Sequence, residues 1–210
     1  MIHFDKQLLN RDKHFYLGFS GGQDSLAAAV FLSRGNYDFT LLHVKHFLSD
    51  NSLNIEQGVL RAARALNLPL QIIQGSSLLS GTEGSAHAIR RRVFDSLDAD
   101  VVIAHTLNDL AETYFQNMLR GHINKIPLLA KVDNRVRPFL RTQRSDFTHL
   151  VHSANVSKYI TPDNMPNSRE ELRSVIFPML GNDLTNVVHR LYIETGLIYN
   201  EIEHKRIITF

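Results

Sequence analysis

The sequence contains no cysteine among its 210 residues. This absence excludes disulfide bonds, thiol nucleophiles, thiolate-ligated zinc and cysteine-held iron–sulfur clusters from this chain. No run of about 18 apolar residues is present either, so a transmembrane helix is not expected. Residues 1–13 mix charged and apolar side chains and lack the apolar stretch of a signal peptide. We therefore expect a cytoplasmic chain with no membrane partner.

Charge of one sign is not in large excess, because 23 Lys and Arg stand against 21 Asp and Glu, a net charge of +2. This balance does not require a nucleic-acid partner, but cationic side chains gather locally in two places. These are residues 90–92 and a stretch that holds Lys131, Arg135, Arg137, Arg141 and Arg144. Both groups could contact phosphates, although a solvated helix face and a basic loop are the simpler interpretation. The histidines include no His-Glu-x-x-His pair, so no zinc site is expected.

Short apolar runs alternate with helical patterns over most of the chain. The predicted strands are residues 14–19, 39–44, 70–73, 101–104 and, as a last short strand, 137–140. The predicted helices between them are residues 25–34, 52–66, 83–97 and 108–120. Alternation of this kind predicts an α/β fold, with an open parallel, Rossmann-like sheet and helices on both of its faces.

The C-terminal part has a different pattern. Residues 145–153, 168–180 and 183–205 are predicted to be helical, with prolines and glycines between them. We therefore expect two domains: a sheet domain at 1–141, and a small helical C-terminal extension at 142–210 that packs on it.

A glycine-rich turn lies where the first strand gives way to the first helix. It consists of Ser20, Gly21, Gly22, Gln23, Asp24 and Ser25. Glycines let the backbone turn tightly, and the N–H groups that begin a helix attract an anion, so the turn predicts a phosphate site. Asp24 would repel a phosphate unless a cation lies between them, which points to Mg²⁺. An ordinary turn in which Asp24 or Ser25 caps the helix is the alternative.

Two well-known nucleotide-binding patterns are missing. The sequence has neither the Gly-x-x-x-x-Gly-Lys-Ser/Thr loop nor the Gly-x-Gly-x-x-Gly turn of dinucleotide-binding folds. The turn at residues 20–25 instead resembles the Ser-Gly-Gly-x-Asp-Ser signature of the PP-loop ATP pyrophosphatases. The resemblance implies cleavage of ATP between its α- and β-phosphates, with the turn holding the pyrophosphate and a substrate oxygen activated as an adenylate.

Four further segments resemble one branch of that family, the tRNA(Ile)-lysidine synthetases, and the likeness runs in order over residues 14–180. The segments are residues 42–46, 83–91, 104–113 continuing to 119–121, and 137–140. The chain departs from the pattern of this branch at His87, Arg91, Asn108, Leu110 and Glu170. Asn108 stands where the pattern has Asp, and Leu110 stands where it has Gln.

This resemblance implies the roles of individual residues. ATP and Mg²⁺ are the expected cofactors. The implied ATP-binding residues are the six of the glycine-rich turn and His43, and the implied metal ligands are Asp24 and Asp109. The implied catalytic residues are Asp24, His105, Asp109 and Glu112, and the implied tRNA or phosphate contacts are Arg90, Arg120 and Arg137. The expected partners are the anticodon loop of tRNA(Ile) with a CAU anticodon and free lysine; a homodimer is left open.

Other functions stay open at this point. One is a different PP-loop adenylating enzyme, acting in tRNA thiolation or in the amidation of a small molecule. The lack of cysteine argues against the thiolating enzymes that depend on a cluster. Another is a nucleotide-binding module without catalysis, which the altered positions Asn108 and Leu110 motivate.

Overall fold

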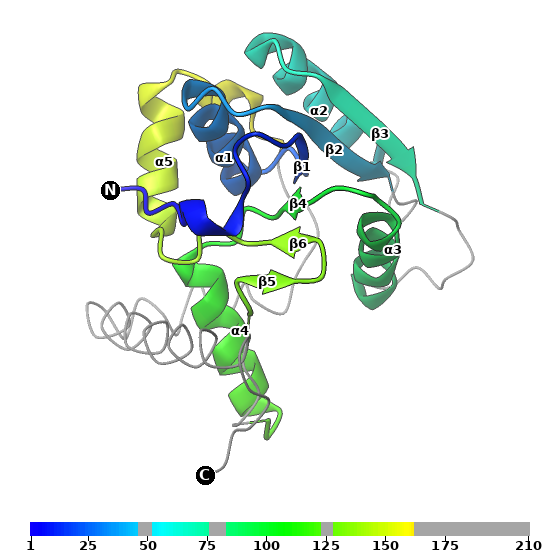
Figure 1. Ribbon diagram of the computed structural model, residues 1–210, viewed down its shortest axis with the longest axis vertical. Coiled ribbons are helices and arrows are strands. Elements are labelled where there is room, and N and C mark those ends of the chain that lie inside the picture. Colours follow the sequence, from blue (N-terminus) through cyan, green and yellow to red (C-terminus); the bar gives the residue numbers. More distant parts are fainter. Residues whose placement is uncertain (46–51, 76–82, 123–127, 162–210) are drawn as a thin grey trace.

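The computed structural model describes residues 1–45, 52–75, 83–122 and 128–161 (Figure 1). Its centre is a six-stranded sheet in the order β3-β2-β1-β4-β6-β5. The strands are β1 (Phe15–Gly18), β2 (Phe39–Lys45), β3 (Leu70–Gln74), β4 (Val101–Val102), β5 (Lys131–Val132) and β6 (Arg135–Val136). All neighbouring strands are parallel except β5 and β6, which form an antiparallel pair at one edge. The predicted α/β class is confirmed, with this edge pair as an addition.

Helices cover both faces of the sheet, as predicted. They are α1 (Gln23–Arg34), α2 (Ser52–Leu66), α3 (Glu83–Asp95), α4 (Leu107–Leu119) and α5 (Arg144–Ser153), with short 3-10 helices η1 (Lys6–Leu8) and η2 (Ser157–Tyr159). Successive side chains of a strand point to opposite faces. Val102 therefore packs in one cluster with residues of α1, α2 and α5, whereas Val101 packs with Phe94 of α3. Figure 1 shows α3 across the sheet from α1 and α5.

The last predicted strand, residues 137–140, is wrong. The chain pairs two residues earlier, in β6, and residues 138–140 form a turn. Pro138 has no backbone N–H to give to a sheet, and Phe139 serves the core instead. The Phe139 ring is fully buried and lies 5.1 Å from the ring of Phe4 and 5.2 Å from that of Phe147. Its apolar character therefore reflects packing beneath α1 and α5 and not strand pairing.

Helix α5 belongs to the same core as the sheet. Phe147 and Val151 are buried in the cluster that contains Leu17 of β1 and Leu26 of α1. The domain boundary at 141 stays a prediction, because the predicted helices at 168–180 and 183–205 lie outside the described residues. Within the described residues, no helix combines the length and the apolar character that crossing a membrane requires.

Candidate active site

The glycine-rich turn lies at the carboxyl end of β1, where ligands bind in open parallel sheets. Gly21 has a φ of +81°, a conformation that side chains other than glycine rarely adopt. Gly22 is the N-cap of α1 and provides no side chain to bond the first N–H groups of the helix. These N–H groups have no partner within a helix, so they point out of its N-terminus with the positive end of the dipole. The turn therefore has the geometry of an anion site.

Side chains within the turn fix its shape. The Gly22 N–H donates to Ser20 Oγ at 3.2 Å, and the Ser25 hydroxyl donates to the Gly22 carbonyl at 2.9 Å. The two hydroxyl oxygens lie 3.2 Å apart. His43, buried at the end of β2, bonds through Nδ1 to the carbonyl of Phe19 at 2.9 Å, directly before the turn. Ser20, Ser25 and His43 thus hold the backbone of the turn in place, and their predicted contact with ATP stays a prediction.

The turn is also fastened from the other end of the described chain. The Thr161 N–H donates to the Gly21 carbonyl at 2.9 Å. A Cβ built on Gly21 would lie 2.6 Å from Thr161 Oγ1, and one built on Gly58 of α2 would lie 2.4 Å from the same oxygen. Two glycines therefore make room for Thr161 between the turn and α2.

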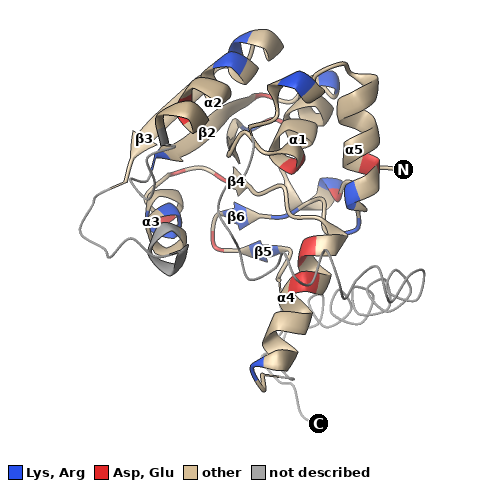
Figure 2. Cartoon of the chain, turned by 180° about the vertical axis from the view of Figure 1, so that it is seen from behind, with Lys and Arg blue, Asp and Glu red and all other residues tan. Residues whose placement is uncertain are grey.

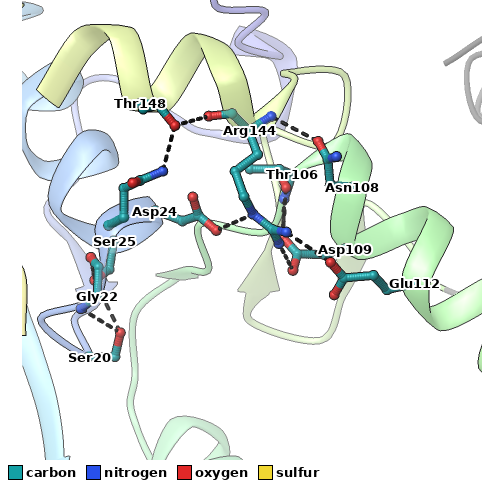
Figure 3. Close-up of polar contacts among 11 residues, drawn as sticks. Ser20, Gly22, Asp24, Ser25, Thr106, Asn108, Asp109, Glu112, Arg144 and Thr148 are labelled. Atoms are coloured by element: carbon teal, nitrogen blue, oxygen red, sulfur yellow. Dashed lines mark hydrogen bonds and ion pairs between the residues drawn. The ribbon is translucent and has the colours of Figure 1, made fainter. Parts of the chain in front are cut away.

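One arginine joins the predicted acidic residues (Figure 3). Arg144, the first residue of α5, donates to a carboxylate from each of three side-chain nitrogens. Nε lies 3.2 Å from Asp24 Oδ2, Nη1 lies 2.8 Å from Glu112 Oε1, and Nη2 lies 2.8 Å from Asp109 Oδ1. The sequence prediction placed Asp24, Asp109 and Glu112 in one site, and the structure brings them together around a residue that the prediction did not assign.

Burial makes these charges interact strongly. Glu112 is fully buried and Asp109 nearly so, whereas Asp24 keeps 25% of its side-chain surface exposed. Burial raises the pKa of Asp109, but the electrostatic influence of His105 and Arg144 and two hydrogen bonds from Thr106 outweigh it, so the pKa lies below its ordinary value. Burial lowers the pKa of Arg144, but the three carboxylates reverse this effect and raise it further above its ordinary value. Asp109 and Arg144 are thus a carboxylate and a guanidinium at neutral pH.

The start of α4 explains two of the altered positions. The N-cap is Thr106, whose N–H and hydroxyl donate to Asp109 Oδ2 at 2.7 and 2.8 Å. Asn108 is not the cap, and its Oδ1 accepts a bond at 2.9 Å from the backbone N–H of Arg144. Leu110 is buried beside Leu107. Asn108 therefore ties α4 to α5, and Leu110 serves packing.

His105 and Arg137 extend the site along the edge of the sheet. Arg137 Nε donates to His105 Nδ1 at 3.2 Å, and its Nη1 donates to the Leu129 carbonyl at 2.8 Å. His105 in turn acts electrostatically on Asp109. Of the three arginines predicted to contact tRNA, Arg137 is thus connected to the carboxylates through His105.

The other two arginines lie elsewhere. Arg120 follows α4, roughly 16 Å along the helix from Asp109 at about 1.5 Å per residue. Figure 2 shows the acidic residues at one end of this helix and the basic residue at the other. Arg90 lies in α3, on the opposite face of the sheet from α1 and α5.

Gln23, another residue of the glycine-rich turn, points to α5. Its side chain donates to Thr148 Oγ1 at 2.7 Å.

Most of the basic stretch at 131–144 is paired with acidic residues. Lys131 Nζ lies 3.3 Å from Asp100, and Arg135 contacts both Asp95 and Asp133 at 3.3 and 3.0 Å. Arg144 binds three carboxylates, so it is not part of the solvated helix face that was the simpler interpretation. No local pattern distinguishes Arg144 from its basic neighbours, because its partner Asp24 is 120 residues away.

The carboxylates fit a divalent cation in their chemistry. Mg²⁺ prefers oxygen ligands and is usually held by one or two carboxylates together with phosphate oxygens. Three carboxylates against one guanidinium leave a formal charge of −2 at this point. Among the described residues, no group of three or more His, Asp or Glu side chains has the arrangement of a complete metal site. Asp24 and Asp109 could supply the one or two carboxylates of such a site, and their role as Mg²⁺ ligands stays a prediction.

Comparison with known proteins identifies the family. A family model described as "PP-loop domain" matches residues 2–180. The chain is 30% identical to a tRNA(Ile)-lysidine synthase of Leifsonia xyli, covering 80% of this chain and 55% of that protein. It is 26% identical to one of Corynebacterium glutamicum, covering 93% and 66% respectively.

This chain thus spans between about half and two thirds of the length of these relatives. A solved structure, the U34-tRNA thiolase of Methanococcus maripaludis with its [4Fe-4S] cluster, shares the fold with a TM-score of 0.75 at 15% identity, covering 94% of this chain and 76% of that one. The chain therefore belongs to the PP-loop family, and ATP binding follows from that membership.

Proposed function

We propose that this chain is an ATP-dependent tRNA-modifying ligase that forms lysidine in tRNA(Ile). In the proposed reaction the C2 oxygen of the first cytidine of a CAU anticodon attacks the α-phosphate of ATP, and pyrophosphate leaves. The ε-amine of free lysine then attacks C2, and AMP leaves. The relatives named tRNA(Ile)-lysidine synthase support this choice within the family.

The observation that carries the proposal is the meeting of the glycine-rich turn with the carboxylates of α4 at one edge of the sheet (Figure 3). The turn offers backbone N–H groups to the phosphates, and Arg144 bonds Asp24 of the turn as well as Asp109 across the site. Donors that are fixed before the substrate arrives stabilise charge as it develops at the α-phosphate. A nucleotidyl-transfer site needs both the N–H groups of such a turn and carboxylates close to it.

Each predicted residue then has a role in the proposal. Asp24 and Asp109 would hold Mg²⁺, which supplies charge neutralisation and orientation of the phosphates. His105 would accept a proton from the lysine ammonium. Glu112 is fully buried and bonded to Arg144, so it acts through that arginine and does not touch the substrate. Arg137 would contact tRNA phosphate near the site, with Arg90 and Arg120 as outer contacts.

The test is incorporation of radiolabelled lysine into an unmodified tRNA that carries a CAU anticodon, with Mg²⁺ and ATP present. We expect incorporation by the wild-type chain and a loss of about 100-fold or more in Asp24→Asn, because the variant removes one ligand of the Mg²⁺ that would neutralise the charge at the α-phosphate. Asp12→Asn, which changes an exposed carboxylate outside the site, is the matched control and should keep its activity.

Other outcomes identify other functions. AMP and pyrophosphate formed without any dependence on tRNA would indicate a small-molecule substrate. Binding of ATP without pyrophosphate release for any substrate would indicate a nucleotide-binding module. Thiolation that relies on a cysteine-held cluster has no ligands in this chain, which contains no cysteine.

A further inference from the structure

Arg144 lies where three helices meet in the site. It begins α5, it contacts Asp24 in the first turn of α1, and it contacts Asp109 and Glu112 in α4. Its backbone is fixed separately, since its N–H donates to Asn108 Oδ1 at 2.9 Å and its carbonyl accepts from Thr148 Oγ1 at 3.0 Å. The guanidinium can therefore change partners while the backbone that carries it stays in place.

Three of the four carboxylate oxygens of Asp24 and Asp109 already accept hydrogen bonds. Asp109 Oδ2 accepts two hydrogen bonds from Thr106, and Oδ1 accepts from Arg144. The Oδ2 atom of Asp24 accepts from Arg144 as well. A dication placed against these oxygens would also face a guanidinium at contact distance, and like charges at that distance repel strongly in a partly buried site. Arg144 and a dication would therefore compete for these two carboxylates.

We propose that Arg144 is a positioning residue that acts as the resident cation of this site. It holds the carboxylates of Asp24 and Asp109 in place when no nucleotide is bound, and it gives them up to the Mg²⁺ that enters with ATP. Glu112, fully buried and 2.8 Å from Nη1, retains the guanidinium nearby after the exchange. The inference rests on the proposed binding of Mg²⁺ and nucleotide, but not on tRNA or lysine.

The first test is Mn²⁺ binding to the nucleotide-free protein, measured from the loss of the free Mn²⁺ signal in electron paramagnetic resonance. Mn²⁺ accepts the same oxygen ligands as Mg²⁺. We expect Arg144→Met, which removes the charge and keeps the length, to bind Mn²⁺ about tenfold more tightly than wild type. Arg144→Lys keeps the charge and should stay near wild type, and Arg144→Met combined with Asp24→Asn should lose the gain.

Arg64→Met changes an exposed arginine of α2 and is the matched control. Equal or weaker Mn²⁺ binding by a folded Arg144→Met variant would overturn the proposal, because it would mean that Arg144 organises the carboxylates without competing for them. The melting temperature of each variant establishes that it is folded.

A second measurement uses the wild-type protein, so it holds even if Arg144→Met does not fold. The Arg144 Nε–H is identified in a nitrogen-15 spectrum by its absence from Arg144→Lys, and its exchange with water is followed. We expect slow exchange without nucleotide and a several-fold increase with Mg²⁺ and α,β-methylene-ATP, but not with the nucleotide and a chelator. An unchanged exchange rate in the saturated complex would contradict the exchange of cations, whether or not the chain makes lysidine.

Discussion

Gly21 shows how much a single residue decides in this site. Its φ of +81° is strained for any other residue, and Thr161 Oγ1 closes the space where a side chain would begin. We expect Gly21→Ala to lower the free energy of unfolding by about 1–2 kcal/mol and to weaken ATP binding, because the backbone must leave the shape that presents its N–H groups.

The neighbouring residue provides the comparison. Gly22 has a φ of −71° and an open approach except for Ser20 Oγ at 3.3 Å. Gly22→Ala should therefore cost only about 0.5 kcal/mol, the ordinary preference of an N-cap. Urea unfolding and calorimetric titration with ATP would measure both variants. Equal effects at the two positions would mean that the left-handed conformation of Gly21 is not what shapes the turn.

At the scale of elements, a single amide ends α3 and joins it to the sheet. Asn134 Nδ2 lies 2.7 Å from the carbonyl of Phe94 in the last turn of α3, and 3.1 and 3.2 Å from those of Leu97 and Ala99 beyond the helix. We expect Asn134→Ala to cost about 1–2 kcal/mol in the free energy of unfolding, since these carbonyls lose their donor.

Asn134→Asp is the sharper variant, because it keeps the size of the side chain and replaces the donor with a carboxylate that faces carbonyl oxygens. It should destabilise the protein at least as much as Asn134→Ala in urea unfolding. A change below about 0.5 kcal/mol in both would show that water replaces the amide without loss.

The same elements show what a sequence can and cannot predict. The amphipathic pattern predicted α2 at its observed bounds, residues 52–66, and the strand predicted at 70–73 is β3. Strands β5 and β6 have two residues each, too few to carry a periodic pattern, so the edge hairpin was missed. Helix α3 ends at Asp95, two residues before the predicted end at residue 97. Asn134, far along the chain, caps this end by donating to the carbonyl of Leu97.

Parts of the site could be predicted from the sequence, and other parts could not. The glycine-rich turn and Asp109 follow strands of one sheet, so their meeting at one edge could be predicted from the order of elements. The link between them could not, since Arg144 pairs with Asp24 and Asp109 at separations of 120 and 35 residues. Contacts of that range depend on packing that no local pattern encodes.

For the whole molecule, the question is whether α5 and the sheet unfold together. Phe147 is fully buried against the Phe139 ring and lies in the cluster shared by β1 and α1. We expect Phe147→Ala to cost about 3–5 kcal/mol and to shift one cooperative transition, monitored by circular dichroism and by fluorescence of the tyrosines. Two separated transitions would favour independent domains with a boundary near 141.

Thr161 bonds the glycine-rich turn, and this contact decides where a fragment of the protein can end. A fragment that stops at residue 141 would contain the whole turn, every described strand and both carboxylates of α4. It would nevertheless lack Arg144, which bridges those carboxylates, and the Thr161 N–H that fastens Gly21. A fragment that keeps these contacts of the nucleotide site therefore extends at least through residue 161. Measurements on a shorter fragment would describe a site without them.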